Sequence, residues 1–294
     1  SVSWNDKINN VGGSPLMYSI GVGLADSYST ITKFDNPEGA LNNYYEGKRI
    51  GEIWGYVTDG FIQDEAEAQR MATIQGDISK TWKVGDIRYK DLDGVEGITS
   101  AKTIYNTGDQ KVIGNTTPRY SFNINASASW KGFDVRVFFE GIAKRDLWID
   151  SPVFWGFPSN SNVWQSAVND YHVDNSWSEN NTNAYYPLPS YSGRSKQTQT
   201  KYLQNGAYIR LKDLTISYTI PKAWISTVGI EQLKVFASGQ NLWVGTKLFK
   251  YLDPDIVSTR QSNSKDNKLV GNLTSDGKAY PFSRTFSFGI NLTF

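Results

Sequence analysis

The sequence lacks the residues on which several classes of protein depend. It contains no cysteine and a single histidine, His172, which excludes disulfide frameworks, thiolate zinc sites and cysteine nucleophiles. No stretch approaches the roughly 18 consecutive apolar residues that a membrane-spanning helix requires. Thirty basic residues balance 29 acidic ones, so the chain lacks the excess of positive charge that is typical of proteins that bind nucleic acid. We therefore expect neither membrane helices nor a nucleic-acid partner.

The first residues carry no secretion signal, because Ser1 to Asn10 lacks a basic start followed by an apolar stretch. Val2 and Trp4 alternate with serines, as at the end of a strand. Turn-forming residues follow, and they are Asn5, Asp6, Asn9, Asn10, Gly12 and Gly13. We therefore expect the sequence to begin inside a strand of a larger protein.

Apolar and polar residues alternate along much of the chain, the pattern of strands with one greasy face. The apolar positions of the last segment are Phe286, Phe288, Ile290, Leu292 and Phe294. Similar alternation covers residues 18–24, 120–130, 133–139 and 209–220, and weaker alternation covers 50–58 and 233–243. A change of parity near Lys212 and Asp213 predicts a β-bulge, and Lys131 with Gly132 predicts a tight hairpin.

The connections between these strands favour a membrane barrel over a soluble β-sandwich, in which two greasy faces would meet in a dry core. Short links at 131–132 and 221–232 contrast with loops of roughly forty residues or more. Barrels place short turns in the periplasm and long loops outside. The sequence therefore predicts an all-β fold, an antiparallel transmembrane β-barrel portion with about seven to eight strands and long extracellular loops. So few strands cannot close a barrel, and the remaining strands must come from elsewhere.

Six stretches carry a family resemblance and cover most of the chain in order. They are residues 51–61, 84–91, 113–120, 130–134, 208–212 and 238–242. In these stretches the sequence resembles the SusC/RagA family of TonB-dependent outer-membrane transporters. The resemblance implies that residues 1–294 are the C-terminal portion of a 22-stranded barrel, with the plug and the N-terminal strands outside this chain.

The same resemblance implies what the whole protein does. It would be a multi-pass barrel of the bacterial outer membrane that imports glycans or peptides, and it would not be an enzyme. A SusD-like surface lipoprotein would cap its extracellular mouth, and TonB would supply energy through the missing part. Two other functions stay open at this point: a soluble carbohydrate-binding β-sandwich, and a glycoside hydrolase, which would need two carboxylates held across a cleft.

The loop between residues 143 and 206 is rich in aromatic residues. Candidates for contact with a substrate or partner are Trp148, Trp155, Trp164, Trp177, Tyr185 and Tyr186. Their flat rings could stack on sugars or anchor a partner. A long ordered loop also needs a small core of its own, which the same rings would supply. Both explanations stay open, with loop packing preferred for any one residue.

Charged residues on the polar side of the strands are candidates for lining a lumen. They are Arg136, Glu140, Arg210, Lys212 and Asp213. They would either lie along a substrate path or form the charge network that a wide polar lumen ordinarily contains.

Asp91, Asp93 and Glu96 form an acidic turn that partly matches the start of a calcium loop. Val95 stands where such a loop would need an oxygen ligand, so an ordinary solvated turn is preferred. A structural calcium ion is the only cofactor considered. His172 stands in a loop without a nucleophile motif around it, so we expect a solvated histidine with no catalytic role.

Overall fold

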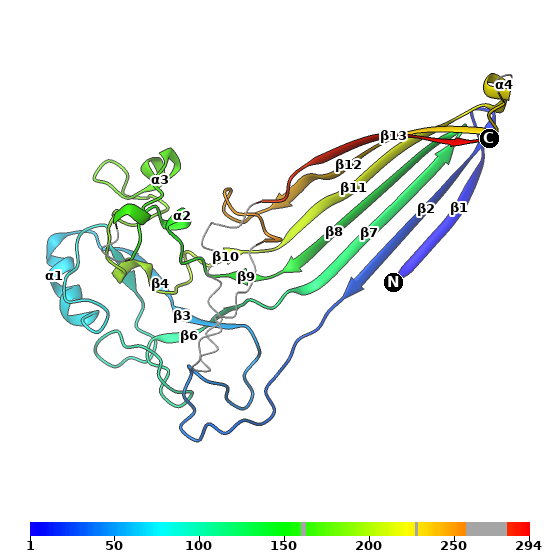
Figure 1. The fold of residues 1–294 in the computed structure, drawn as a ribbon. Helices are drawn as coiled ribbons and strands as arrows, with labels where there is room; N and C mark the ends of the chain where they lie inside the picture. The colour runs from blue at the N-terminus through cyan, green and yellow to red at the C-terminus, as the bar shows by residue number, and fades with distance from the viewer. Residues whose placement is uncertain (160–162, 227–228, 257–280) are drawn as a thin grey trace.

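The computed structural model describes residues 1–159, 163–226, 229–256 and 281–294. One large antiparallel sheet extends from a head formed by the long connections between its strands (Figure 1). In spatial order the strands of the sheet are β1 (Val2–Val11), β2 (Ser14–Ala25), β7 (Arg119–Trp130), β8 (Phe133–Lys144), β11 (Tyr208–Ile220), β12 (Gln232–Thr246) and β13 (Thr285–Thr293).

The head consists of residues 26–118, 145–207 and 247–256. Three two-stranded sheets within it pair β3 (Glu52–Tyr56) with β6 (Gln110–Asn115), β4 (Thr58–Phe61) with β5 (Ile87–Tyr89), and β9 (Asp146–Leu147) with β10 (Gln204–Asn205). Its helices are α1 (Glu65–Ile74), α2 (Pro152–Trp155), η1 (Val163–Gln165), α3 (Asp170–Asn175) and η2 (Arg194–Lys196). The helix α4 (Lys222–Ile225) lies at the opposite end of the sheet (Figure 1). None of the helices in the described ranges is long and apolar enough to cross a membrane.

Strand pairing lines up the apolar positions of the large sheet on one face. One row of paired residues crosses six strands through Tyr18, Ala128, Val135, Ile216, Ala237 and Phe288. This face is open, and the Phe288 residue at the end of that row is 81% exposed. A β-sandwich would bury such side chains against a second sheet, so the structure contradicts that alternative.

Two local predictions are confirmed by the strand register. Leu211 lies opposite Phe139 and Asp213 lies opposite Phe138, so Lys212 is an extra residue on β11. This β-bulge restores a common apolar face for the leucines on either side of it. The β7–β8 hairpin closes through Lys131 and Gly132 with φ of 48° and 84°, the left-handed pair that a two-residue turn requires.

Two predictions about strands are wrong. The N-terminal segment is the ten-residue strand β1, which includes Asn5, Asp6, Asn9 and Asn10, although these residues were predicted to form a turn. The polar positions of an amphipathic strand have the same composition as a turn, which explains the error. The segment at 50–58 lies outside the large sheet, and its β3 pairs with β6 in the head.

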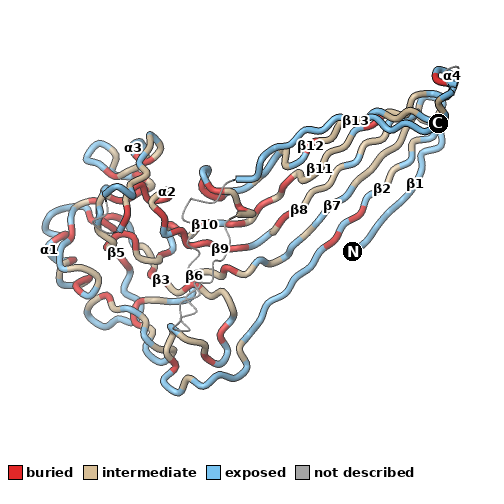
Figure 2. The backbone as a smooth tube through the Cα atoms, viewed as in Figure 1, coloured by how far each residue is buried: buried red, intermediate tan, exposed pale blue. Residues whose placement is uncertain are grey.

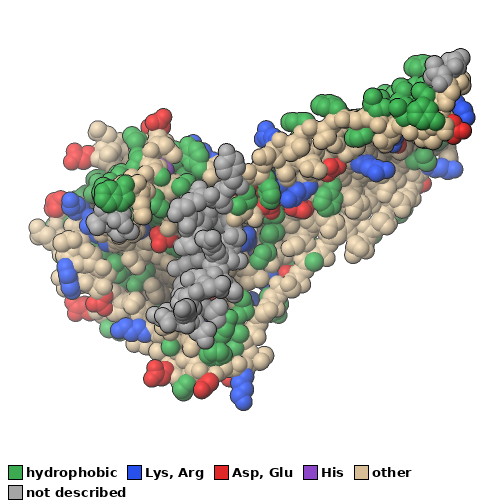
Figure 3. Space-filling view, viewed as in Figure 1, with side chains coloured by type: hydrophobic (Ala, Val, Ile, Leu, Met, Phe, Trp, Pro, Cys, Tyr) green, Lys and Arg blue, Asp and Glu red, His purple; other side chains and the backbone are tan. Residues whose placement is uncertain are grey.

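Burial divides the molecule into two parts. Buried residues concentrate in the head, whereas the strands of the large sheet are mostly exposed or half-buried (Figure 2). Among the described residues, the hydrophobic core contains no residue of the seven long strands. Hydrophobic side chains gather along one side of the sheet, up to the end that carries α4 (Figure 3).

Candidate functional site

A network of charged side chains lies where the polar face of the sheet meets the head. The side chain of Arg210 is only 3% exposed, and its Nε lies 2.9 Å from Asp255 Oδ2. A second Arg210 nitrogen pairs with Asp253 Oδ1. Lys212 Nζ lies 2.8 Å from Glu140 Oε1 and 3.3 Å from Asp255 Oδ2. Two cations therefore share three carboxylates, which we call the Arg210 network.

Aromatic side chains border the Arg210 network. The hydroxyl of Tyr208 donates a hydrogen bond to Asp255 Oδ1. The guanidinium of Arg210 and the ammonium of Lys212 lie 5.3 and 4.8 Å from the centroid of the Phe282 ring. Contact with a ring face adds to the attraction of carboxylates for a partly desolvated cation. The network thus connects β8 and β11 to the segment at residues 247–256.

Strand geometry places both cations of this network on the same face of β11. Arg210 faces Glu140 in the register between β8 and β11, and side chains two residues apart on a regular strand share a face. The extra residue at Lys212 allows Lys212 and Asp213 to lie on the polar face in succession. The two cations, Arg210 and Lys212, are two residues apart, and so are the carboxylates of Asp253 and Asp255 that pair with them.

The structure brings three of the five predicted lumen residues together, namely Glu140, Arg210 and Lys212. The other two lie on the same sheet but outside the network. Arg136 is exposed on β8, and Asp213 accepts a hydrogen bond from Thr215 Oγ1 at 3.0 Å.

The other two acidic members of the network, Asp253 and Asp255, were not among the site candidates of the sequence analysis. Asp253 and Asp255 are two residues apart, as are Arg210 and Lys212, and this shared spacing is the feature of the sequence that could have indicated the pairing.

A second polar cluster lies near the β7–β8 turn. Asp134 Oδ2 is 2.7 Å from Lys234 Nζ. Ser129 Oγ donates to Asp134 Oδ1 at 2.5 Å, and Ser217 Oγ lies 3.5 Å from Asp134 Oδ2. The cluster joins four neighbouring strands on the polar face, far from the Arg210 network along the sheet.

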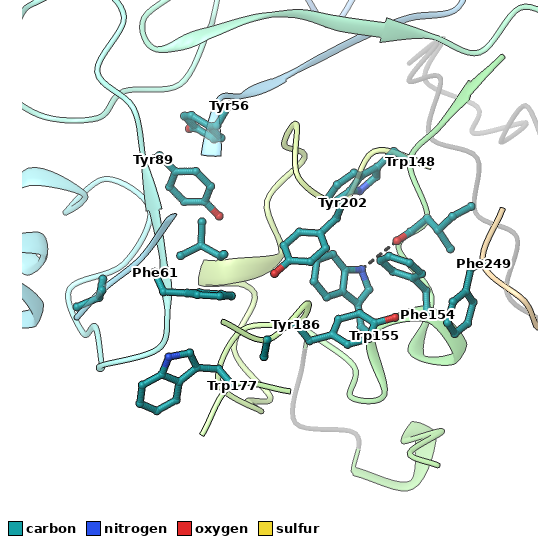
Figure 4. Close-up of a cluster of buried hydrophobic side chains, with 14 of the residues drawn as sticks. Tyr56, Phe61, Tyr89, Trp148, Phe154, Trp155, Trp177, Tyr186, Tyr202 and Phe249 are labelled. Carbon is teal, nitrogen blue, oxygen red and sulfur yellow. Dashed lines mark hydrogen bonds between the residues drawn. The ribbon is translucent and has the colours of Figure 1, made fainter. Parts of the chain in front are cut away.

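Most of the predicted aromatic contact residues pack inside the head. Trp148, Trp155, Trp177 and Tyr186 are buried in the head core, where the rings of Trp155 and Tyr186 contact those of Phe154 and Tyr202 (Figure 4). The indole Nε1 of Trp155 donates to the carbonyl of Ile149 at 2.9 Å. Tyr185 is half-buried, and its hydroxyl accepts a hydrogen bond from Gln204 at 3.0 Å. In this arrangement these rings form the hydrophobic core of the 143–206 loop and are not free to stack on a ligand.

Trp164 differs from the other candidates, because 84% of its surface is exposed. It stands on the short helix η1 at the surface of the head. Of the six aromatic candidates, it therefore presents the most ring surface to a ligand or partner in solution.

The expectation of a solvated His172 is wrong, because the side chain is 1% exposed in the head core. Nδ1 accepts a hydrogen bond from the backbone N–H of Asn169 at 3.3 Å, and Nε2 lies 3.1 Å from the carbonyl oxygen of Phe154. Nδ1 is therefore unprotonated, and Nε2 carries the proton that it donates. Burial lowers the pKa of His172, which keeps the ring neutral.

The acidic turn brings together a different set of carboxylates from the one predicted. Ligand atoms of Asp91, Asp93 and Asp109 lie within 4.8 Å of one another, and Glu96 is outside this group. Asp109 is fully buried, and its carboxylate accepts a hydrogen bond from the backbone N–H of Leu92 at 2.6 Å. Three oxygen donors at this spacing fit a hard cation such as calcium.

Comparison with known proteins gives consistent matches. No protein-family model matches the chain. TonB-dependent receptor P3 of Formosa agariphila is 30% identical over 249 residues, which are 85% of this chain and 22% of that protein. TonB-dependent receptor P26 of the same organism is 26% identical over 72% of this chain and 20% of its own length. The chain thus spans about a fifth of the length of these relatives.

Solved structures match over almost the whole chain. The RagAB peptide importer in its open-open state has a TM-score of 0.63 at 18% identity, over 99% of this chain and 28% of that one. A structure of the RagAB peptide transporter has a TM-score of 0.61 at 19% identity, again over 99% of this chain. These similarities confirm the resemblance carried by the six sequence stretches: the chain is similar in sequence to TonB-dependent receptors and shares the fold of the RagAB structures.

Proposed function

We propose that the chain forms part of the barrel wall and the extracellular loops of an outer-membrane importer. The observation that carries this proposal is the open apolar face of the large sheet. A row of apolar side chains crosses six of the seven strands, and Val2 and Trp4 of β1 lie opposite the apolar Val22 and Ile20 of β2. Exposed apolar patches of that extent mark a surface that contacts a membrane or another protein. Lipid chains would cover this face, while the polar face would line the lumen.

The edges of the sheet support a larger barrel. Within the described part of the chain, β1 and β13 each pair with a neighbour on one side only. An unpaired strand edge in lipid costs several kcal/mol for each unsatisfied backbone group. Strands outside residues 1–294 would therefore complete the barrel, as in the 22-stranded transporters, and a plug would fill it.

The arrangement of the connections supports an orientation. Short turns and the C-terminus lie at one end of the sheet, and the head lies at the other (Figure 1). With short turns in the periplasm, the head would face outward. A SusD-like lipoprotein would then dock on the head side, and TonB would act through the missing part of the transporter.

The cargo would be a glycan or a peptide. Similarity to importers described as peptide transporters favours a peptide. The Arg210 network offers charges of both signs on the polar face, which suits charged peptide termini. The exposed ring of Trp164 would contact cargo or the lipoprotein. A structural calcium ion would be held by Asp91, Asp93 and Asp109.

The absence of cysteine permits a direct test of the face assignment. Ile290→Cys and Asn291→Cys place single thiols on opposite faces of β13, in a chain that has no other thiol. In outer membranes that contain the complete receptor, with any cysteine outside residues 1–294 replaced, a water-soluble maleimide should label Asn291→Cys and leave Ile290→Cys unlabelled, because a thiol among lipid chains stays protonated. Equal labelling of both positions by the water-soluble reagent would contradict the proposal.

Import is tested separately from topology. Cells that lack the receptor should lose uptake of a labelled oligopeptide, and reintroduction of the receptor gene should restore it. Restored uptake of a labelled glycan in place of the peptide would assign the cargo to the other class. Recovery of neither would contradict an importer role.

A further inference from the structure

The link between β11 and β12 carries an exposed tryptophan. In helix α4, Ile225 is 6% exposed, whereas its neighbour Trp224 is 71% exposed. The helix packs against β12, so the buried isoleucine fixes the helix and the tryptophan projects from it. A large indole left in solvent beside a buried anchor calls for a partner.

We propose that Trp224 anchors this end of the sheet in the headgroup layer of the adjacent lipid leaflet. The inference rests on the proposed membrane role and names the residue that sets the depth of the β11–β12 link. An indole has a large apolar body and a single N–H donor, and it therefore prefers the boundary between hydrocarbon and water.

The position of α4 along the sheet supports this partner. The last apolar row at this end joins Ile220, Leu233 and Leu292, and α4 begins two residues after Ile220. Trp224 therefore follows the point at which the apolar face ends. Hydrophobic side chains continue to this end of the molecule in the space-filling view (Figure 3).

Neighbouring side chains have the chemistry of an interface. Lys222 is exposed on the same helix, and its ammonium would reach lipid phosphates while its methylene stem covers apolar surface. Phe133, on the apolar face near this end, is 50% exposed, and its ring lies 4.4 Å from that of Tyr218. Aromatic residues at the end of an apolar band, with a cation beside them, match a lipid headgroup layer.

Depth-dependent fluorescence quenching tests the anchor. The complete receptor is placed in nanodiscs whose phosphatidylcholine is brominated either near the headgroup or near the chain ends. The emission of Trp224 is obtained as the difference between the wild-type protein and Trp224→Phe. We expect bromine near the headgroup to quench this emission more strongly than bromine near the chain ends. Trp164→Phe, which removes an 84% exposed indole from the head, should remove only unquenched emission. If neither brominated lipid quenches the emission that Trp224→Phe removes, the proposed anchor is wrong.

The same nanodiscs separate failure of the anchor from failure of the membrane role. Trp4 and Trp243 lie on the apolar face at 62% and 48% exposure. Their emission is measured as the signal that Trp4→Phe and Trp243→Phe each remove. Brominated lipid should quench it whether or not Trp224 contacts lipid. Quenching of these two with none at Trp224 would overturn the anchor alone, and no quenching at any of the three would overturn both proposals.

Discussion

The sheet and the head use the same kinds of side chain in opposite ways. In the head, aromatic rings pack on one another, as when Trp155 and Tyr202 lie 4.7 Å apart between centroids. In the sheet, apolar residues such as Phe288 and Ile290 stay open to the surroundings. A head of this kind is stabilised by its own core, as in a water-soluble protein. Among the described residues, no second layer covers the apolar face of the sheet.

The polar residues of the two regions differ as well. The head buries polar groups in its core, as it does with His172 and with the ion pair of Arg194 and Asp86. Most charges of the sheet lie on its polar face, where Lys212 pairs with Glu140 and Lys234 with Asp134 across strands. Substitutions that act on one region and spare the other should therefore separate the two kinds of stability.

The largest expected effect comes from removing the centre of the head core. Phe154 is fully buried, and its ring contacts those of Trp155, Tyr186 and Phe249. Phe154→Ala should lower the free energy of unfolding of the head by about 3 to 5 kcal/mol, because it leaves a cavity. Denaturant titration followed by limited proteolysis of the head measures this, with membrane insertion unchanged.

Trp164→Ala is the matched control for the head. Its ring is exposed, so the free energy of unfolding should change by no more than about 0.5 kcal/mol. A loss at Trp164 as large as that at Phe154 would show that the assigned core is wrong.

Removing the cation at the junction of the two regions should have an effect of similar size. Arg210→Met leaves Asp253 and Asp255 without their main partner, and breaking a buried pair in this way costs about 3 to 5 kcal/mol. Faster proteolysis within residues 247–256 would report the loss. Arg136→Met removes an exposed cation from the same face and should leave the cleavage rate unchanged. Equal cleavage rates in the two variants would show that the Arg210 network does not hold residues 247–256 in place.

A charge on the open face of the sheet should disturb assembly in the membrane and leave the head intact. Ile290→Arg places a cation among lipid chains, at a cost of about 2 to 4 kcal/mol. Asn291→Arg places the same cation on the polar face, and it should have a milder effect. Recovery of both variants in the outer-membrane fraction at equal yield would contradict the assigned faces.

The smallest effect is a pH dependence confined to the head. Burial lowers the pKa of His172 in the folded protein, whereas an unfolded chain takes up the proton below its ordinary pKa of 6.5. The unfolded state then binds more protons, so stability should fall as the pH drops below that value. Above it, both states are neutral and this contribution is constant.

The titration of His172 can be isolated by substitution. His172→Gln removes the titrating group, and the difference in melting temperature between the two proteins should widen in favour of the variant as the pH falls from 7.5 to 5. Parallel melting curves across this range would exclude the histidine as the cause.

The large sheet could be predicted in good part from the sequence, because its signal is local. Alternation identified most of its long strands, and a change of parity identified the bulge at Lys212. The errors arose where local composition has two explanations. β1 carries asparagines that suit a turn as well as a strand, and only pairing with β2 decides between them.

The head and the site could be predicted only in fragments, because they depend on contacts between distant segments. Asp109 joins Asp91 and Asp93 from another part of the chain, and Asp253 meets Arg210 across 43 positions. His172 was misjudged because its burial comes from Phe154 and the aromatic rings around it. Apart from the shared two-residue spacing of Arg210 with Lys212 and of Asp253 with Asp255, the sequence carries no local signal for these contacts.

Residues 248–255 belong to both regions. Leu248, Phe249 and Leu252 lie in the head core, while Asp253 and Asp255 are ion-paired to β11. This short stretch therefore ties β11 to the interior of the head by ion pairs at one end and by apolar packing at the other. A shift of β11 against the head at this point would have to break the ion pairs or draw Leu252 out of the core.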